Sequence, residues 1–157
     1  MTKVELAYRA LHALLSEMAL ASDACPDEVF RNRTVAMLLS DSRTGVTASL
    51  NLLDEKGRFL AEEVTGPGED GRFEIVQPAM LEVIVIEASD EERDARFDAI
   101  MGALAAFFRD LDDDLGGLVD DISVTDPPDR FILQAVEGAK AARVRIDMTM
   151  TLPTVFG

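Results

Sequence analysis

Side chains that commonly carry enzyme chemistry are scarce in this sequence. His12 is the single histidine and Cys25 is the single cysteine. A nucleophilic triad needs a histidine beside its nucleophile, and a zinc site needs several histidine or cysteine ligands. Cys25 lies between Asp23 and Asp27 in the sequence, and acidic neighbours oppose the formation of a reactive thiolate. We therefore expect structural or surface roles for His12 and Cys25, and we do not expect an enzyme.

Carboxylates gather between residues 110 and 121, where a calcium loop is the chemistry to consider. Calcium binds carboxylates at alternating positions of a loop that follows a helix. The sixth position of this stretch is Leu115 where such a loop needs glycine, and the twelfth is Asp121 where a bidentate glutamate is usual. The pattern favours a solvated acidic helix end and leaves cation binding open. The central acids of the patch are Asp112, Asp113 and Asp114.

Three glycines, Gly66, Gly68 and Gly71, have the spacing of a dinucleotide-binding fingerprint. That fingerprint works only where a helix opens directly after it, because the helix N-terminus holds the phosphates. Residues 72–76 instead favour an extended segment. The sequence therefore predicts a polar loop here, and no cofactor.

The charge balance is strongly acidic. Thirty Asp and Glu face fifteen Lys and Arg, which gives a formal net charge of −15. Phosphate binding needs Lys and Arg, so specific nucleic-acid binding is not expected, and an anionic membrane surface would repel the chain. The amphipathic first segment does not fit a signal peptide, and no run approaches 18 apolar residues. One cysteine fits a reducing compartment, so we expect a protein made in a cytoplasm.

Arginine is the dominant base, since only three of the fifteen basic residues are lysines. Its planar guanidinium binds carboxylates through two hydrogen bonds, which favours it in interfaces. If arginines on one copy met the acids at 112–114 on the next, the contacts would run head to tail, and such contacts can close into rings. Scattered surface charge is the alternative. The arginines of this possible subunit interface are Arg31, Arg33, Arg43, Arg143 and Arg145.

Hydrophobic periodicity predicts the elements that would position these residues. Apolar residues at three- and four-residue steps predict helices over 3–20 and 89–111. Ser89 and Glu92 fit a capping box at the start of the second helix. The near-continuous apolar run 79–87 predicts a strand at the centre of the sheet.

Shorter segments complete the expected sheet. Residues 47–53 and 58–64 predict a hairpin, 118–125 a strand, and 126–129 a turn. Strict alternation over 142–152 predicts a strand with one wet face, which carries Arg143 and Arg145. Residues 28–39 remain ambiguous between strand and loop. Together these elements predict a single α+β domain over residues 1–157, with two main helices packed against a mixed, mostly antiparallel sheet.

The second half of the chain resembles the phage tail terminator, or tail completion, family of minor tail proteins. The resemblance lies in the order of its segments: the hydrophobic strand 80–87, the acid-capped helix 89–111, the run Leu-Gly-Gly-Leu-Val-Asp-Asp at 115–121, and the closing strand 142–152. The N-terminal helix ahead of the sheet also suits this family.

This resemblance implies a structural, non-enzymatic protein of a virion tail that is assembled in the host cytoplasm. Family members form a ring, usually a hexamer, on the last ring of the tail tube, stop tube growth and provide the surface that joins the capsid. The expected partners are further copies of the chain, the tail tube protein and the head–tail connector proteins. Two other hypotheses come from different classes: a small cytoplasmic adaptor unrelated to phage tails, and an enzyme that uses acidic residues with a divalent metal.

Overall fold

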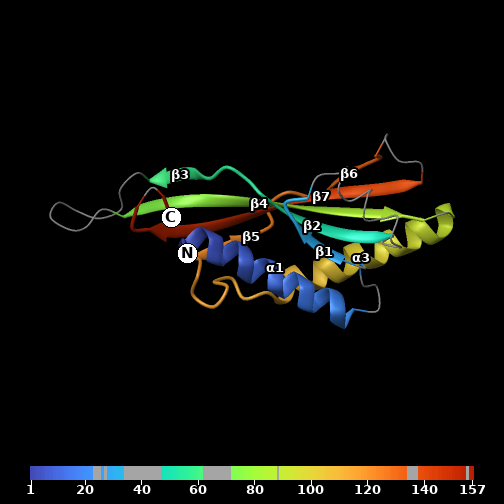
Figure 1. Ribbon diagram of the computed structural model, residues 1–157, viewed down its shortest axis with the longest axis horizontal. Coiled ribbons are helices and arrows are strands. Elements are labelled where there is room, and N and C mark those ends of the chain that lie inside the picture. The colour runs from blue at the N-terminus through green and yellow to red at the C-terminus, as the bar shows by residue number, and fades with distance from the viewer. Residues whose placement is uncertain are drawn as a thin grey trace.

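A computed structural model gives the fold of the chain and describes residues 1–22, 26, 28–33, 47–61, 72–87, 89–133, 138–154 and 156–157. Two long helices and seven strands make up this part of the protein (Figure 1). The α+β class predicted from the sequence is therefore confirmed. The strands are β1 (Glu28–Arg31), β2 (Ala48–Asp54), β3 (Arg58–Ala61), β4 (Phe73–Ile86), β5 (Asp121–Ser123), β6 (Asp129–Phe131) and β7 (Ala139–Leu152).

Both helices begin at the residues that the sequence indicates. Helix α1 spans Lys3–Ala21, and the Thr2 hydroxyl caps it by accepting a hydrogen bond from the Glu5 backbone N–H at 3.2 Å. Helix α3 spans Asp90–Asp110, and the Ser89 hydroxyl accepts from the Glu92 N–H at 3.3 Å. A side chain at this position satisfies one of the backbone donors that a helix start leaves without a partner. The helix that was expected over 89–111 is confirmed.

The sheet is built on two 14-residue strands, β4 and β7, which pair along their whole length. All strand pairs are antiparallel except β1 with β2, which is parallel. Because β4 and β7 are so long, each has two different outer neighbours. At one end the strand order is β1-β2-β4-β7-β6, and at the other it is β3-β4-β7-β5, which we call the narrow half-sheet.

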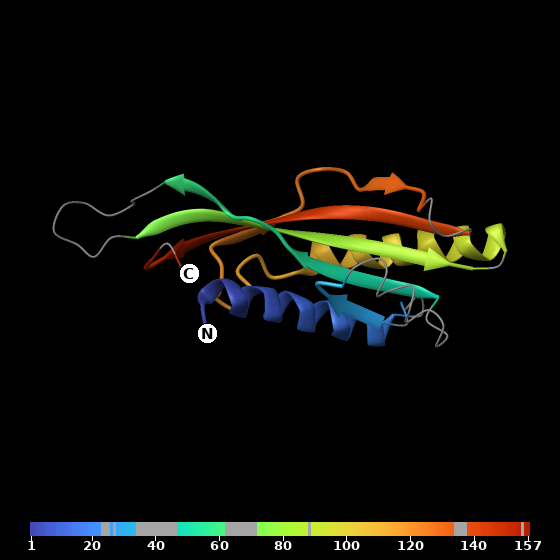
Figure 2. The same cartoon turned by 45° about the horizontal axis from the view of Figure 1, so that its top comes forward.

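The two helices lie on the same face of the sheet, as Figures 1 and 2 show. Alternate residues of each long strand point to this face and form the main core with the helices. On β7 the residues that point to this face alternate with the solvent-facing positions that the sequence predicted. The largest fully buried side chains of this core include Leu11, Leu15, Leu81, Phe97, Leu104, Ile146 and Met148.

Strand pairing differs from the expected hairpin. Strand β3 pairs with β4 and not with β2, so the hairpin predicted from 47–53 and 58–64 is wrong in its partner. Strand β4 starts at residue 73 and therefore extends past the end of β2, which leaves its first part free to pair with β3. Residues 62–64 lie outside the described residues. Pro78 lies inside β4, between the positions that pair with β2 and those that pair with β3, where its missing N–H interrupts neither pairing.

Other expected boundaries shift as well. The predicted strand over 118–125 is present but short, since β5 covers only Asp121–Ser123. Strand β6 follows a segment in which only a turn was expected. The ambiguous stretch 28–39 contains β1, and its residues 34–39 are not among those described.

Candidate functional site

Arg31 forms contacts within its own subunit. Its guanidinium donates two hydrogen bonds to the Glu5 carboxylate, both of 2.8 Å, and also binds the carboxylate of Asp54 at 2.8 and 3.1 Å. It lies over the Tyr8 ring, 5.2 Å from its centroid. Arg31 and Arg9 together lower the pKa of the Glu5 carboxyl to about 2. Arg31 thus joins α1 to the β1–β2 edge of the sheet, and its role in a subunit interface stays a prediction.

The other arginines expected at an interface are placed differently. Arg33 is exposed, with its guanidinium over the Phe30 ring. Arg145 is partly exposed and binds Asp147 at 3.0 Å. Arg43 and Cys25 fall outside the described residues.

Arg143 lies on the sheet face that carries no helix. It belongs to one row of directly paired residues that crosses β2, β4, β7 and β6: Asn51, Glu82, Arg143 and Asp129. The Glu82 carboxylate is almost fully buried, and it accepts hydrogen bonds from Arg143 at 3.1 Å and from the Asn51 amide at 3.4 Å. The alternation of β7 predicted that Arg143 faces away from the helices, and this is confirmed. The buried partner on β4 was not anticipated, because Glu82 sits within an apolar run of the sequence.

The acidic patch follows the end of α3. Asp112, Asp113 and Asp114 are all exposed. The Asp114 carboxylate accepts a hydrogen bond from the Gly116 N–H at 2.9 Å, within a turn in which Leu115, Gly116 and Gly117 all have positive φ. Asp110 pairs with the adjacent Arg109. Within the described ranges, no three His, Cys, Asp or Glu side chains converge to hold a metal ion.

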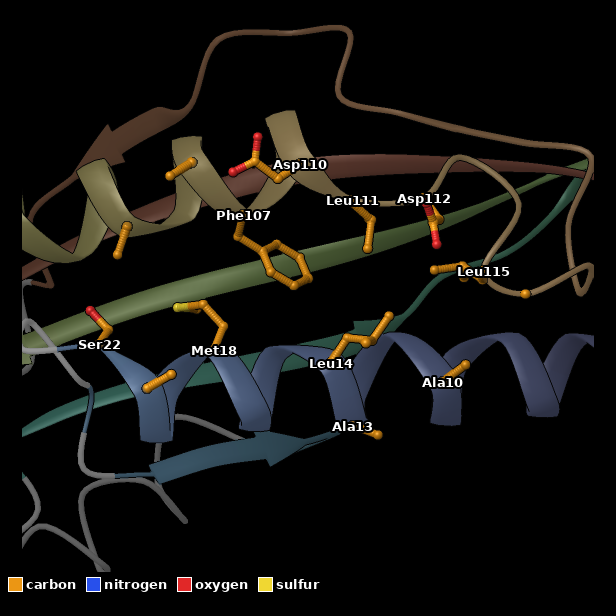
Figure 3. Close-up of a pocket in the computed structure, with 14 residues that line it drawn as sticks. Ala10, Ala13, Leu14, Met18, Ser22, Phe107, Asp110, Leu111, Asp112 and Leu115 are labelled. Carbon is orange, nitrogen blue, oxygen red and sulfur yellow. The ribbon is translucent and has the colours of Figure 1, made fainter.

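The helices leave an apolar groove between them, of about 810 Å³ (Figure 3). Leu14 and Met18 of α1 point across it toward Phe107 of α3 and toward Leu111, which follows α3. Two carboxylates, Asp110 and Asp112, are among the lining residues, and small residues line much of the rest. The groove can hold an apolar segment or side chain. Helical periodicity placed Leu14, Met18, Phe107 and Leu111 on the apolar faces of the two predicted helices, but it predicted no groove between them.

Two further polar groups are tied to the backbone. The ring Nε2 of His12 lies 3.0 Å from the carbonyl oxygen of Val29, so His12 links α1 to β1. The buried Tyr8 hydroxyl donates to the carbonyl oxygen of Pro78 and accepts from Gln77 at 3.0 Å and from the Glu55 N–H at 3.1 Å. Burial raises the pKa of Tyr8 above its ordinary value. Both side chains hold elements together, which agrees with the structural or surface role expected for His12.

The largest exposed apolar side chains on a strand are on β3. Phe59 and Leu60 are 51% and 50% exposed. Sequence reasoning placed them in a hairpin and gave them no function. Their signal was weak, since a four-residue segment with two adjacent apolar residues does not alternate.

Comparisons with known proteins identify a shared fold. No helix in the described part of the chain has the length and apolar character to cross a bilayer. No family model matches the sequence, and no curated protein matches it. One solved structure, of a protein whose name states no function, is similar over 92% of this chain and 94% of its own, with a TM-score of 0.52 and 16% identity. The chain therefore shares a fold with that protein.

Proposed function

We propose that this chain is a structural protein of a phage or prophage tail, which forms a ring at the end of the tail tube, stops tube growth and provides the surface that joins the capsid. It acts without catalysis or cofactor, in the virion tail after assembly in the host cytoplasm. Its partners are further copies of itself, in a ring that we take to be a hexamer, together with the tail tube protein and the head–tail connector proteins. The order of segments shared with tail terminators supports this proposal.

One structural observation supports it most directly, namely the two unlike edges of the narrow half-sheet. Each subunit of a ring contacts one neighbour on either side, and the two contact surfaces differ. The narrow half-sheet ends in β3 on one side and in β5 on the other. Neither strand has a second strand partner among the described residues. A subunit with two different open edges can add neighbours in one direction and so close a ring.

The strong negative charge fits the passage of DNA through such a ring. A channel lined by carboxylates repels phosphates, so DNA passes without adhering. The thirty Asp and Glu residues, which give the chain its net charge of −15, supply these carboxylates.

Deleting the coding sequence from the genome that carries it tests the proposal. We expect headless tails of uncontrolled length in electron micrographs, and plasmid-borne protein should restore normal virions. Light scattering of the purified chain over a wide concentration range should detect a discrete closed oligomer, either for the chain alone or after tail tubes are supplied. Normal virions after deletion would overturn the proposal.

A small adaptor is the second candidate, and the groove between α1 and α3 favours it. An amphipathic segment could place its apolar side against Leu14, Met18 and Phe107, with a basic residue near Asp110 and Asp112. A stable monomer that binds one such protein partner, and loses it when Met18→Glu narrows and charges the groove, would favour the adaptor. Binding that survives this change would count against it.

A further inference from the structure

The two edge strands of the narrow half-sheet are both short and exposed. Strand β3 presents Arg58, Phe59 and Leu60 to solvent. On the opposite edge Asp121 is exposed and Val124, just after β5, is 37% exposed. Unpaired edge strands offer backbone N–H and C=O groups that can pair with another strand, and apolar side chains there strengthen the pairing.

The strand directions allow these two edges to join head to tail. All three pairs in the narrow half-sheet are antiparallel, so β3 and β7 run in one direction while β4 and β5 run in the other. If a second copy is placed beside the first in the same orientation, its β5 lies antiparallel to the first copy's β3. The sheet then continues across the boundary with the same alternation of strand directions.

The charges on the two edges are opposite. Arg58 is exposed on β3, and Asp121 is exposed on β5. Asp120, just before β5, is also exposed, whereas the residues before β3 carry one charge of each sign, Glu55 and Lys56. Two-fold pairing of β3 with β3, or of β5 with β5, would bring like charges together, which is destabilising in a sheet. Pairing of β3 with β5 brings opposite charges together. The charge pattern therefore selects the head-to-tail arrangement.

Register places the two charges at the same level. Arg58 lies opposite Val76, Val76 opposite Thr149, and Thr149 opposite Asp121. Directly paired residues point to the same face of a sheet. Arg58 and Asp121 are thus the two ends of one row, on the face without helices. Neither side chain has a hydrogen bond or ion pair within the described residues.

The same register sets where the aromatic residue of β3 would lie. Phe59 pairs with Ile75, which belongs to the main core, so Phe59 points to the helix-covered face. Ile75 pairs with Met150, the residue after Thr149. Phe59 of a neighbouring copy would therefore lie opposite Asp120, on the helix-covered face.

We infer that β3 of one copy pairs antiparallel with β5 of the next, with Arg58 beside Asp121 and with Phe59 opposite Asp120. This inference rests on the proposed ring and assigns its subunit contact. It brings in the edge strands β3 and β5, which the sequence did not place at an interface.

A contact between two short strands is transient, and a cysteine trap detects it even so. The chain would carry Arg58→Cys and Asp121→Cys together in a Cys25→Ser background. Within one copy the two positions are separated by three strand spacings, roughly 14 Å, whereas a disulfide spans no more than about 7 Å between Cα atoms. Any disulfide between them therefore joins two chains. Mild oxidation should give a ladder of covalent trimers and larger species on a non-reducing gel.

Matched variants separate this contact from random collisions and from two-fold dimers. A chain with Glu17→Cys and Glu91→Cys, two exposed helix positions, should give no ladder under the same conditions. Phe59→Ser in the trap variant should lose the species above dimer while circular dichroism shows an intact fold. The inference would be overturned if the trap variant cross-linked no faster than the helix control. It would also be overturned if either single-cysteine variant rapidly formed dimers.

The two proposals can fail separately. A closed oligomer by light scattering without the ladder would mean that the ring forms through other residues, so only the edge contact fails. A ladder together with normal virions after gene deletion would leave the edge contact standing and would remove the tail function.

Discussion

Glu82 and Arg143 stand directly opposite each other on β4 and β7, with 3.1 Å between the Arg143 Nε and the Glu82 Oε2. Their exposures differ widely, since the Glu82 side chain is 6% exposed and the Arg143 side chain 48%. A buried carboxylate is costly unless it is paired and hydrogen-bonded. Arg143 supplies that pairing from the solvent side of the sheet.

Arg143→Ala should therefore destabilise the protein by about 1–3 kcal/mol, because it leaves a buried carboxylate with the Asn51 amide as its remaining partner. Adding Glu82→Gln should recover much of the loss, since the buried charge is then gone. Urea denaturation measures both changes. Arg109→Ala is the control, because it removes an exposed ion pair and should cost much less than Arg143→Ala. Equal losses for Arg143→Ala and Arg109→Ala would contradict the role of the buried partner.

Tyr8 is the only tyrosine, and the chain has no tryptophan, so ultraviolet absorbance reports its ionisation directly. Burial raises its pKa in the folded state. The native protein should therefore titrate above the ordinary value of about 10, and the urea-unfolded protein should titrate near it. A native titration at or below the unfolded one would show that the phenol is not buried as described.

The same shift makes stability depend on alkaline pH. A raised folded-state pKa stabilises the fold fully below the unfolded pKa, and this contribution is lost as pH rises beyond about 10. Tyr8→Phe should remove this part of the alkaline loss. At neutral pH it should cost about 1–3 kcal/mol, because Gln77 and the Glu55 N–H lose a buried acceptor. Thermal denaturation at pH 7 and in the alkaline range tests both statements.

Glu5 predicts a dependence on acidic pH with the opposite sign. Its pKa is lowered in the folded state from 4.5 to about 2 by Arg31 and Arg9. Its contribution is therefore present above about pH 4.5 and is lost as pH falls toward 2. Glu5→Gln should flatten that part of the acid profile, with a loss under about 1 kcal/mol at pH 7, since the pair is partly exposed to solvent.

Glu17→Gln removes an exposed charge from the same helix and is the control for Glu5→Gln. Its acid profile should keep the wild-type slope between pH 4.5 and 2. If both variants flattened the profile equally, net charge and not the Arg31 contacts would explain the dependence.

The acidic surface should keep the protein from binding DNA. Fluorescence anisotropy with a short duplex at about 50 mM salt should show no association, because non-specific binding requires Lys and Arg at the phosphates. Tight binding that weakens with added salt would contradict the proposed passage of DNA through the ring.

Divalent metals should leave the melting temperature unchanged. A ligand that binds only the folded state raises stability in proportion to the logarithm of its concentration over Kd. At the end of α3 and after it, Asp110 pairs with Arg109 and Asp114 accepts from the Gly116 N–H. Within the described residues no three acidic, histidine or cysteine side chains converge to hold a metal ion. A saturable rise with calcium, magnesium or manganese would instead support the metal-dependent enzyme.

The sequence by itself determined the elements whose signals are local. Apolar residues at helical spacing and a serine cap located α1 and α3, and the alternation of β7 located the wet face that carries Arg143 and Arg145. Each of these signals lies within one segment, where neighbouring side chains and backbone donors fix the conformation. The α+β class follows from their order.

Only the tertiary structure decided which strands pair and which charges meet. The length of β4 transferred β3 from β2 to β4, because a 14-residue strand extends beyond a 7-residue neighbour and leaves backbone groups to be paired. Arg31 pairs with Glu5, 26 residues away in the sequence, and Glu82 pairs with Arg143, 61 residues away. Such contacts depend on the strand order and register of the whole sheet, and these are set by the burial of one common core rather than by any single segment.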